Sequence, residues 1–128
     1  MPVVRLNNLG FRYPGTDRWI VENLTLTVEA GEFLAIVGES GVGKSTILRI
    51  IAGLIEPQAG TVEIAGDTDR TRRRRAMVFQ DSRLMPWRRV ESNVMLGLEG
   101  LSLTRDDAAR RVEAVLLLTG LADLGHRW

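Results

Sequence analysis

The segment Gly38-Glu39-Ser40-Gly41-Val42-Gly43-Lys44-Ser45-Thr46 decides how the rest of this 128-residue sequence is interpreted. It fits the pattern G-x-x-x-x-G-K-S/T, a loop that binds phosphate groups. Lys44 is the only lysine among the 17 lysines and arginines of the chain, and it stands where a compact ammonium charge suits phosphate chemistry. The sequence therefore predicts a site for a nucleoside triphosphate.

The residues on either side of this loop favour a strand-loop-helix unit. Phe33–Val37 is a continuous apolar run, which predicts a strand covered on both faces. From position 44 onward apolar residues recur at helical spacing, and Gly53 is a plausible stop. The apolar face of this predicted helix is formed by Ile47, Ile50 and Ile51. Strand, glycine-rich loop and helix in this order are the context that supports the motif.

Each residue type in the loop has a chemical reason. Glycines allow the backbone to approach phosphate closely, so that successive N–H groups and the start of the helix surround an anion. Lys44 is expected to reach the β and γ phosphates, Ser45 to ligate Mg²⁺, and Thr46 to donate to the α phosphate. The residues expected to bind the nucleotide here are Gly38, Ser40, Gly41, Val42, Gly43, Lys44, Ser45 and Thr46.

Composition excludes several classes of protein. Hydrophobic residues make up 45% of the chain, enough for a folded core, and the absence of cysteine excludes disulfides and thiolate metal sites. No apolar run is long enough to span a bilayer and no signal peptide is visible, so we expect a soluble chain that meets a membrane through a partner. The arginine run 72–75 has no interleaved aromatic residues, which favours a solvated loop over a nucleic-acid surface.

The remaining elements can be placed from local patterns. Strands are predicted over 3–6, 24–28, 61–64 and 76–80, the last of them buried, and a short helix over 91–98. Thr104 and Asp107 resemble a capping box at the start of a further helix, which Gly120 is expected to end. Packing positions on that helix are Ala108, Val112, Val115 and Leu116.

Three segments in order resemble the N-terminal part of an ABC-transporter ATPase subunit. They are Phe11-Arg12-Tyr13-Pro14-Gly15, the phosphate loop with its continuation through Glu56-Pro57-Gln58-Ala59-Gly60, and Val78-Phe79-Gln80-Asp81. The resemblance implies that Tyr13 stacks on adenine, and that Gln80 helps to ligate Mg²⁺ and to position water. Residues 84–87, Leu-Met-Pro-Trp, are most similar to the ATPases of nitrate, sulfonate, taurine and bicarbonate importers.

The resemblance also implies an architecture and partners. The fold class is α/β, a P-loop NTPase core with an antiparallel β subdomain, truncated before the family's signature motif. Residues 1–90 would form the β-rich nucleotide-binding portion, and 91–128 the start of a helical subdomain. The cofactors implied are ATP and Mg²⁺. The partners are a membrane-spanning permease, reached through the region after Gln80, and a second ATPase subunit in a homodimer, with no nucleic acid. The subunit would be cytoplasmic and peripheral on the inner face of the cell membrane.

The sequence departs from the family pattern in its catalytic parts. It contains no Leu-Ser-Gly-Gly-Gln signature and no apolar strand ending in Asp-Glu, and His126 lacks the context of the family's switch histidine. With Lys44 and Gln80 as its catalytic residues, the full-length subunit would be an ATPase, whereas this chain alone is expected to bind ATP with little turnover. Two alternatives stay open: a non-enzymatic fragment that binds nucleotide or a partner, and another P-loop enzyme such as a small kinase. Tyr13 could also be a turn aromatic packed on the sheet, and Gln80 a polar strand end.

Overall fold

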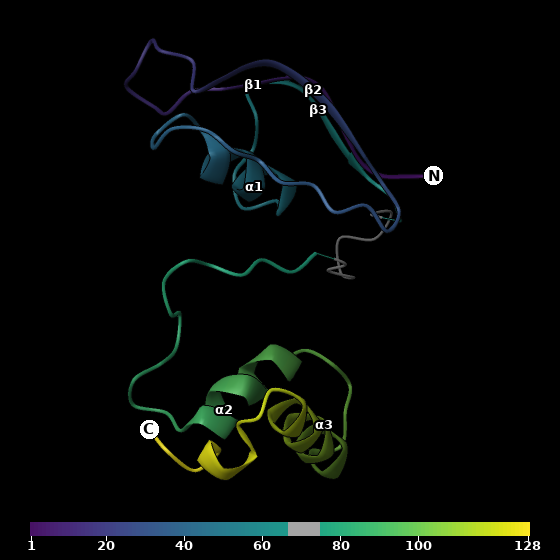
Figure 1. The fold of residues 1–128 in the computed structure, drawn as a ribbon, viewed down its shortest axis with the longest axis vertical. Helices are drawn as coiled ribbons and strands as arrows, with labels where there is room; N and C mark the ends of the chain where they lie inside the picture. Colours follow the sequence, from purple (N-terminus) through teal and green to yellow (C-terminus); the bar gives the residue numbers. More distant parts are fainter. Residues whose placement is uncertain (67–74) are drawn as a thin grey trace. The chain divides into compact units, whose positions relative to one another are not determined.

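The computed structural model describes residues 1–66 and 75–128. The chain divides into two compact units, Met1–Val78 and Phe79–Trp128, and each is described by itself (Figure 1). The predicted boundary between residues 90 and 91 separates a nucleotide-binding portion from a helical subdomain. It is a different division from these two compact units, and it stays a prediction. Within the described ranges, no helix combines the length and apolar character needed to cross a bilayer.

The first unit is built on a three-stranded antiparallel sheet. Its strands are β1 (Pro2–Phe11), β2 (Val21–Glu29) and β3 (Ala59–Ile64), in the order β2-β1-β3. The register pairs Leu6 of the central strand with Leu26 on one side and Val62 on the other. The antiparallel subdomain and three of the predicted strands are therefore confirmed, with β1 and β2 extending beyond the predicted ranges.

One helix, α1 (Lys44–Ile51), covers a face of this sheet (Figure 1). Ile50 is 2% exposed and packs with the sheet residues, as the periodicity predicts. Gly53 follows with φ +73°, a conformation that ends a helix at low cost for glycine. Each fully buried aliphatic side chain contributes about 1.5–3 kcal/mol. The buried core of this unit consists of Leu6, Leu9, Phe11, Val21 and Ile50.

Two predicted strands are wrong. Phe33–Val37 has no regular structure, and Phe33 is 93% exposed. Ala76–Gln80 is equally irregular, and Val78 is 96% exposed. Both runs are apolar enough for a buried strand, but a strand also needs a neighbour to pair its backbone groups. In the described ranges, the sheet consists of β1, β2 and β3 and pairs with neither run.

The arginine run is described only at its last residue. Residues 72–74 lie outside the described residues, and the solvated loop stays a prediction there. Arg75 donates from its guanidinium to the backbone carbonyl of Ile51 at 2.8 Å, in a half-buried position. A cation at the C-terminal end of α1 complements the partial negative charge of the last carbonyl groups. Arg75 is thus half-buried and bonded to the end of α1, and the solvated loop over 72–75 stays a prediction.

The second unit is helical. It contains α2 (Val90–Met95), the 3₁₀ turn η1 (Leu96–Leu98), α3 (Arg105–Leu118) and the 3₁₀ turn η2 (Ala122–Leu124). The predicted helix over 91–98 is thus an α-helix that tightens into a 3₁₀ turn. Val112 and Leu116 are buried, as predicted for packing positions, whereas Val115 is 46% exposed. The expected packing of Val115 is therefore wrong.

The start of α3 has the predicted cap. The Asp107 amide donates to the Thr104 hydroxyl at 3.1 Å, and that hydroxyl donates to the Asp107 carboxylate at 2.7 Å. Arg110 donates to the same carboxylate at 2.6 Å. The Thr104 hydrogen bond, followed by the one from Arg110, holds the pKa of Asp107 below its usual value. Gly120 follows the helix with φ +71°, as expected for a C-terminal stop.

Candidate nucleotide-binding site

Lys44 closes the glycine-rich loop on itself. Its ammonium group donates to the carbonyl of Gly38 at 2.9 Å and also to the carbonyl of Glu39. These bonds run from the first residue of α1 back to the start of the loop, so the charge lies inside the curve of residues 38–43. A cation held by carbonyl groups within a loop of exposed backbone can exchange those partners for phosphate oxygens.

Gly43 is fixed by packing as well as by conformation. It is buried with φ +105°, and a Cβ there would lie 2.9 Å from both Ile20 Cγ2 and the Ile20 carbonyl oxygen. Gly41 differs, because its φ is +81° but a Cβ would meet no atom within 4 Å. One glycine therefore anchors the loop to the sheet, and the other faces open space. This open, backbone-lined curve beside an ammonium group fits a phosphate chain.

The start of α1 is suited to an anion. No side chain caps it by a hydrogen bond, and its first turn contains no acidic residue. Ser45 is exposed, in the position from which it could ligate a metal ion, whereas Thr46 is only 4% exposed. The Thr46 hydroxyl hydrogen-bonds the Tyr13 hydroxyl at 3.1 Å. The expected bond from Thr46 to an α phosphate stays a prediction, since this hydroxyl already has a protein partner.

Tyr13 lies beside the phosphate loop rather than apart from it. Its ring meets Phe11 edge to face, with centroids 5.0 Å apart and planes at 89°. The residue is 39% exposed, so part of the ring faces solvent. Packing against Phe11 and partial exposure coexist, which accommodates both interpretations of this residue. Adenine stacking on Tyr13 stays a prediction.

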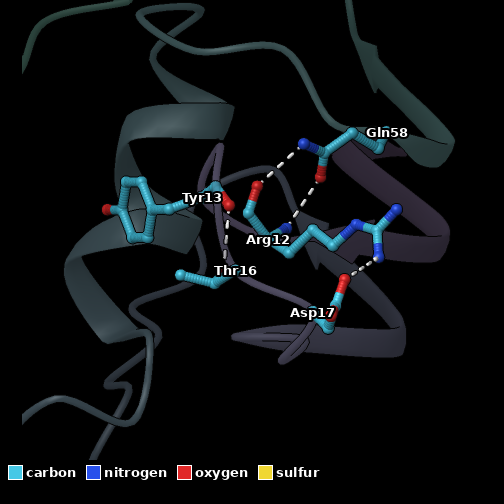
Figure 2. Close-up of polar contacts among 5 residues, drawn as sticks. All are labelled: Arg12, Tyr13, Thr16, Asp17 and Gln58. Carbon is cyan, nitrogen blue, oxygen red and sulfur yellow. Dashed lines mark hydrogen bonds and ion pairs between the residues drawn. The ribbon is translucent and has the colours of Figure 1, made fainter.

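A glutamine that the sequence analysis did not single out holds the backbone next to Tyr13. Figure 2 shows Gln58 paired with both backbone groups of Arg12, at 2.7 Å each. The Arg12 guanidinium lies 3.9 Å from Asp17 and 5.2 Å from the centre of the Trp19 ring. An open depression of 360 Å³ is lined by residues 12–17 and Gln58. The sequence carries no local signal for this pairing, since the partners are 46 positions apart.

In the second unit, the loop after Gln80 is organised by Asn93. The Met85 amide donates to the Asn93 side-chain oxygen at 2.7 Å. The Asn93 amide nitrogen donates to the carbonyls of Met85, Arg88 and Arg89 at 3.2, 3.0 and 3.1 Å. Trp87 in this loop is 68% exposed, and the docking of a permease on the region after Gln80 stays a prediction.

Two of the predicted site residues belong to different compact units. Ser45 belongs to the first unit and exposed Gln80 to the second, so their joint role at Mg²⁺ stays a prediction. Among the residues described, no group of three His, Asp or Glu side chains could hold a metal ion. His126 lines a groove of 370 Å³ in the second unit, with Glu91 and Glu113 among its neighbours.

A glycine-rich loop of this pattern at the start of a helix is typical of P-loop nucleotide-binding domains. The chain belongs to the ABC transporter family, whose family model matches residues 21–128. An aliphatic sulfonates import ATP-binding protein of Pseudomonas putida is 41% identical over 126 residues, covering 98% of this chain and 44% of that protein. Its counterpart in Rhodococcus jostii strain RHA1 is 46% identical over 123 residues, covering 96% of this chain and 46% of that protein. The chain thus spans less than half the length of these curated relatives.

Solved structures share the fold. A dimeric, post-hydrolysis ATP-binding cassette bound to ADP and Pi matches with a TM-score of 0.80 and 29% identity, covering 96% of this chain and 60% of that one. An ATP-binding subunit of an ABC transporter matches with a TM-score of 0.78 and 27% identity, covering 97% of this chain and 53% of that one. The P-loop NTPase fold predicted from the sequence is confirmed by these neighbours.

Proposed function

We propose that this chain is the nucleotide-binding part of the ATPase subunit of an ABC importer for aliphatic sulfonates or related solutes. The observation that carries the proposal is the Lys44 ammonium group within the glycine-rich loop, 2.9 Å from the Gly38 carbonyl. Membership of the ABC transporter family and the names of the sulfonate-import relatives support the solute class.

Each group near the loop has a part in holding Mg-ATP. Lys44 would leave the carbonyls of Gly38 and Glu39 for the β and γ phosphate oxygens, which carry more charge. The backbone of residues 38–43 would surround the phosphates, and the ring of Tyr13, a residue that is 39% exposed, would stack on the base. Ser45 and Gln80 are the residues that would hold Mg²⁺, whose positive charge neutralises the charge developing on the phosphate oxygens.

Binding and turnover separate in this proposal. Phosphoryl transfer depends on positioning and electrostatic stabilisation, and this sequence contains no Asp-Glu pair after an apolar strand to orient water. We infer that the chain alone binds Mg-ATP and turns it over little. In the longer subunit, a second copy would complete the site and a permease would meet the Met85–Arg89 loop, on the inner face of the cell membrane.

Calorimetry and phosphate release test these two statements separately. Titration of the protein with Mg-ATP is expected to give saturable binding that Lys44→Ala abolishes or strongly weakens. Phosphate release under the same conditions is expected to stay at the background of the Lys44→Ala variant. Absence of binding would refute the nucleotide site, whereas hydrolysis that depends on Lys44 would refute the low-turnover statement alone.

A further inference from the structure

At the end of the sheet, the side chain of Gln58 makes the pair of hydrogen bonds that a neighbouring strand's backbone would otherwise make. Strand β1 ends at Phe11 and β3 begins at Ala59, so Arg12 and Gln58 lie just outside the ladder. The Gln58 backbone amide still donates to the Gly10 carbonyl at 3.0 Å. Its side-chain amide then accepts from the Arg12 N–H and donates to the Arg12 carbonyl, both at 2.7 Å (Figure 2). Both backbone groups of Arg12 are thus satisfied by one side chain.

Tyr13 follows Arg12 directly in the chain, and hydrogen bonds hold both its backbone carbonyl and its phenol hydroxyl. Its carbonyl accepts from the Thr16 amide at 3.2 Å and the Thr16 hydroxyl at 3.0 Å, which closes the turn. Its phenol hydroxyl contacts Thr46 in the first turn of α1. Gln58, in turn, lies on the segment that leads from α1 into β3. Tyr13 is therefore bonded directly to the first turn of α1, and its neighbour Arg12 is bonded to the segment that follows α1.

We propose that Gln58 is a positioning residue for the base-binding tyrosine, through its paired hydrogen bonds to the Arg12 backbone. The Gln58 amide fixes the position of the Tyr13 ring relative to the phosphate loop. The ring and the loop can then bind the base and the phosphates of the same nucleotide. This inference rests on the proposed nucleotide site and adds a residue that does not touch the nucleotide. Its effect is preorganisation, because a ring already held in place loses less freedom on binding.

Gln58 is exposed, so its replacement is expected to leave the fold intact. Gln58→Met keeps the length of the side chain and removes both hydrogen bonds. Gln58→Glu keeps the acceptor for the Arg12 N–H but loses the donor to the Arg12 carbonyl. Asn7→Ala is the matched control, because it removes an exposed side-chain bond to Thr61 on the same pair of strands, 3.4 Å long, without touching the turn.

The discriminating measurement compares Mg-ATP with magnesium tripolyphosphate, which has the phosphates but no base. By calorimetry, Gln58→Met is expected to weaken ATP binding about fivefold to tenfold, within what base stacking contributes. Tripolyphosphate binding is expected to stay within about twofold of wild type, since phosphate contacts are unchanged. Gln58→Glu should give an intermediate loss, and Asn7→Ala none.

A second readout needs no ligand. Tyr13 is the only tyrosine of the chain, so 3-fluorotyrosine gives one ¹⁹F NMR signal from this ring. Gln58→Met is expected to shift or broaden that signal, and Asn7→Ala to leave it as in wild type. An unchanged signal in Gln58→Met overturns the positioning role, whatever the binding constants show.

The outcomes separate the two proposals. If wild type prefers ATP over tripolyphosphate and Gln58→Met keeps that preference, the positioning role is overturned and the nucleotide site stands. If Gln58→Met weakens both ligands equally, Gln58 is a general structural residue and the inference is again overturned. If wild type binds ATP no better than tripolyphosphate, the result refutes both base stacking on Tyr13 and the positioning role of Gln58.

Discussion

The aromatic turn at residues 12–17 and the loop at residues 85–89 are both held by a side-chain amide, but to different degrees. Gln58 is exposed and binds one residue, Arg12, in a turn that packing against Phe11 and the Thr46 hydroxyl also hold. Asn93 is half-buried and binds three residues of its loop through four hydrogen bonds.

Because of this difference, we expect substitutions in the two regions to affect different properties of the protein. Where several elements share the task of holding a turn, the loss of one hydrogen-bonded side chain affects its precise position more than its existence. Where one side chain makes most of the bonds that hold a loop, its loss removes several hydrogen bonds at once, and each contributes about 0.5–1.5 kcal/mol to stability. We therefore expect substitutions near the phosphate loop to affect nucleotide binding, unless they break packing, and substitutions at Asn93 to affect local stability.

The largest effect is expected where the phosphate loop depends on packing. Gly43→Ala places a Cβ 2.9 Å from Ile20 at φ +105°. Backbone strain and overpacking each cost about 1–3 kcal/mol, so the unfolding free energy should fall by roughly 2–4 kcal/mol. Urea unfolding measures this. Gly41→Ala is the control, since it has strain without a clash, and equal losses in the two variants would contradict the packing argument.

Removal of the loop's charge comes next. Lys44→Ala is expected to weaken Mg-ATP binding about 10- to 100-fold, because a charged hydrogen bond contributes about 1.5–3 kcal/mol. Calorimetry measures the dissociation constant. Arg49→Ala, in the last turn of the same helix, removes a positive charge away from the loop and should change binding little. A similar loss in both variants would mean that only net charge matters.

Asn93→Ala tests the loop that a single amide holds. We expect the unfolding free energy of the second unit to fall by about 1–3 kcal/mol, because the Met85 amide and the Arg88 carbonyl lose their hydrogen bonds to the side chain. The carbonyls of Met85 and Arg89 keep the backbone N–H groups of Arg88 and Asn93 as donors. Hydrogen exchange at Met85 should accelerate. Asn93→Asp, which keeps the acceptor for that amide, should preserve its protection. Mg-ATP binding should not change, and a binding defect as large as that of Lys44→Ala would refute the proposed separation between the two regions.

A smaller effect is expected at the cap of α3. Thr104→Ala removes the hydroxyl that accepts from the Asp107 amide, and N-cap losses of this kind cost about 0.5–2 kcal/mol. Circular dichroism during thermal unfolding measures the change. Thr104→Ser keeps the hydroxyl and should retain most of the stability. If the alanine variant is as stable as wild type, the hydroxyl does not cap this helix in solution.

The smallest effect is a dependence on pH. Because hydrogen bonds from Thr104 and Arg110 lower the pKa of Asp107, its folded form binds a proton less readily than its unfolded form. The stabilisation is fully present above the pKa of an ordinary aspartate and is lost as pH falls through the lower, folded value. NMR titration of the Asp107 carboxyl group measures that pKa, and Thr104→Ala should raise it. An unshifted value in wild type would contradict these hydrogen bonds.

Much of the candidate site follows from neighbours in sequence. The spacing of glycines and Lys44 predicts the loop, apolar positions at helical spacing predict α1, and Thr104 with Asp107 predicts the start of α3. Each of these features depends on residues within a few positions of one another, so the local sequence contains the interaction that forms it. The resemblance to a known family adds Tyr13 and Gln80, whose roles no local spacing reveals.

Tertiary structure decided the rest. The apolar runs Phe33–Val37 and Ala76–Gln80 have the composition of strands but no strand that pairs with them among the described residues. Gly43 needs to be glycine partly because Ile20 from another segment packs against it. Gln58 acquires a role only because folding brings Arg12 beside it. Strand pairing, close packing and side-chain bonds to distant backbone depend on which segments meet, and local pattern does not specify that.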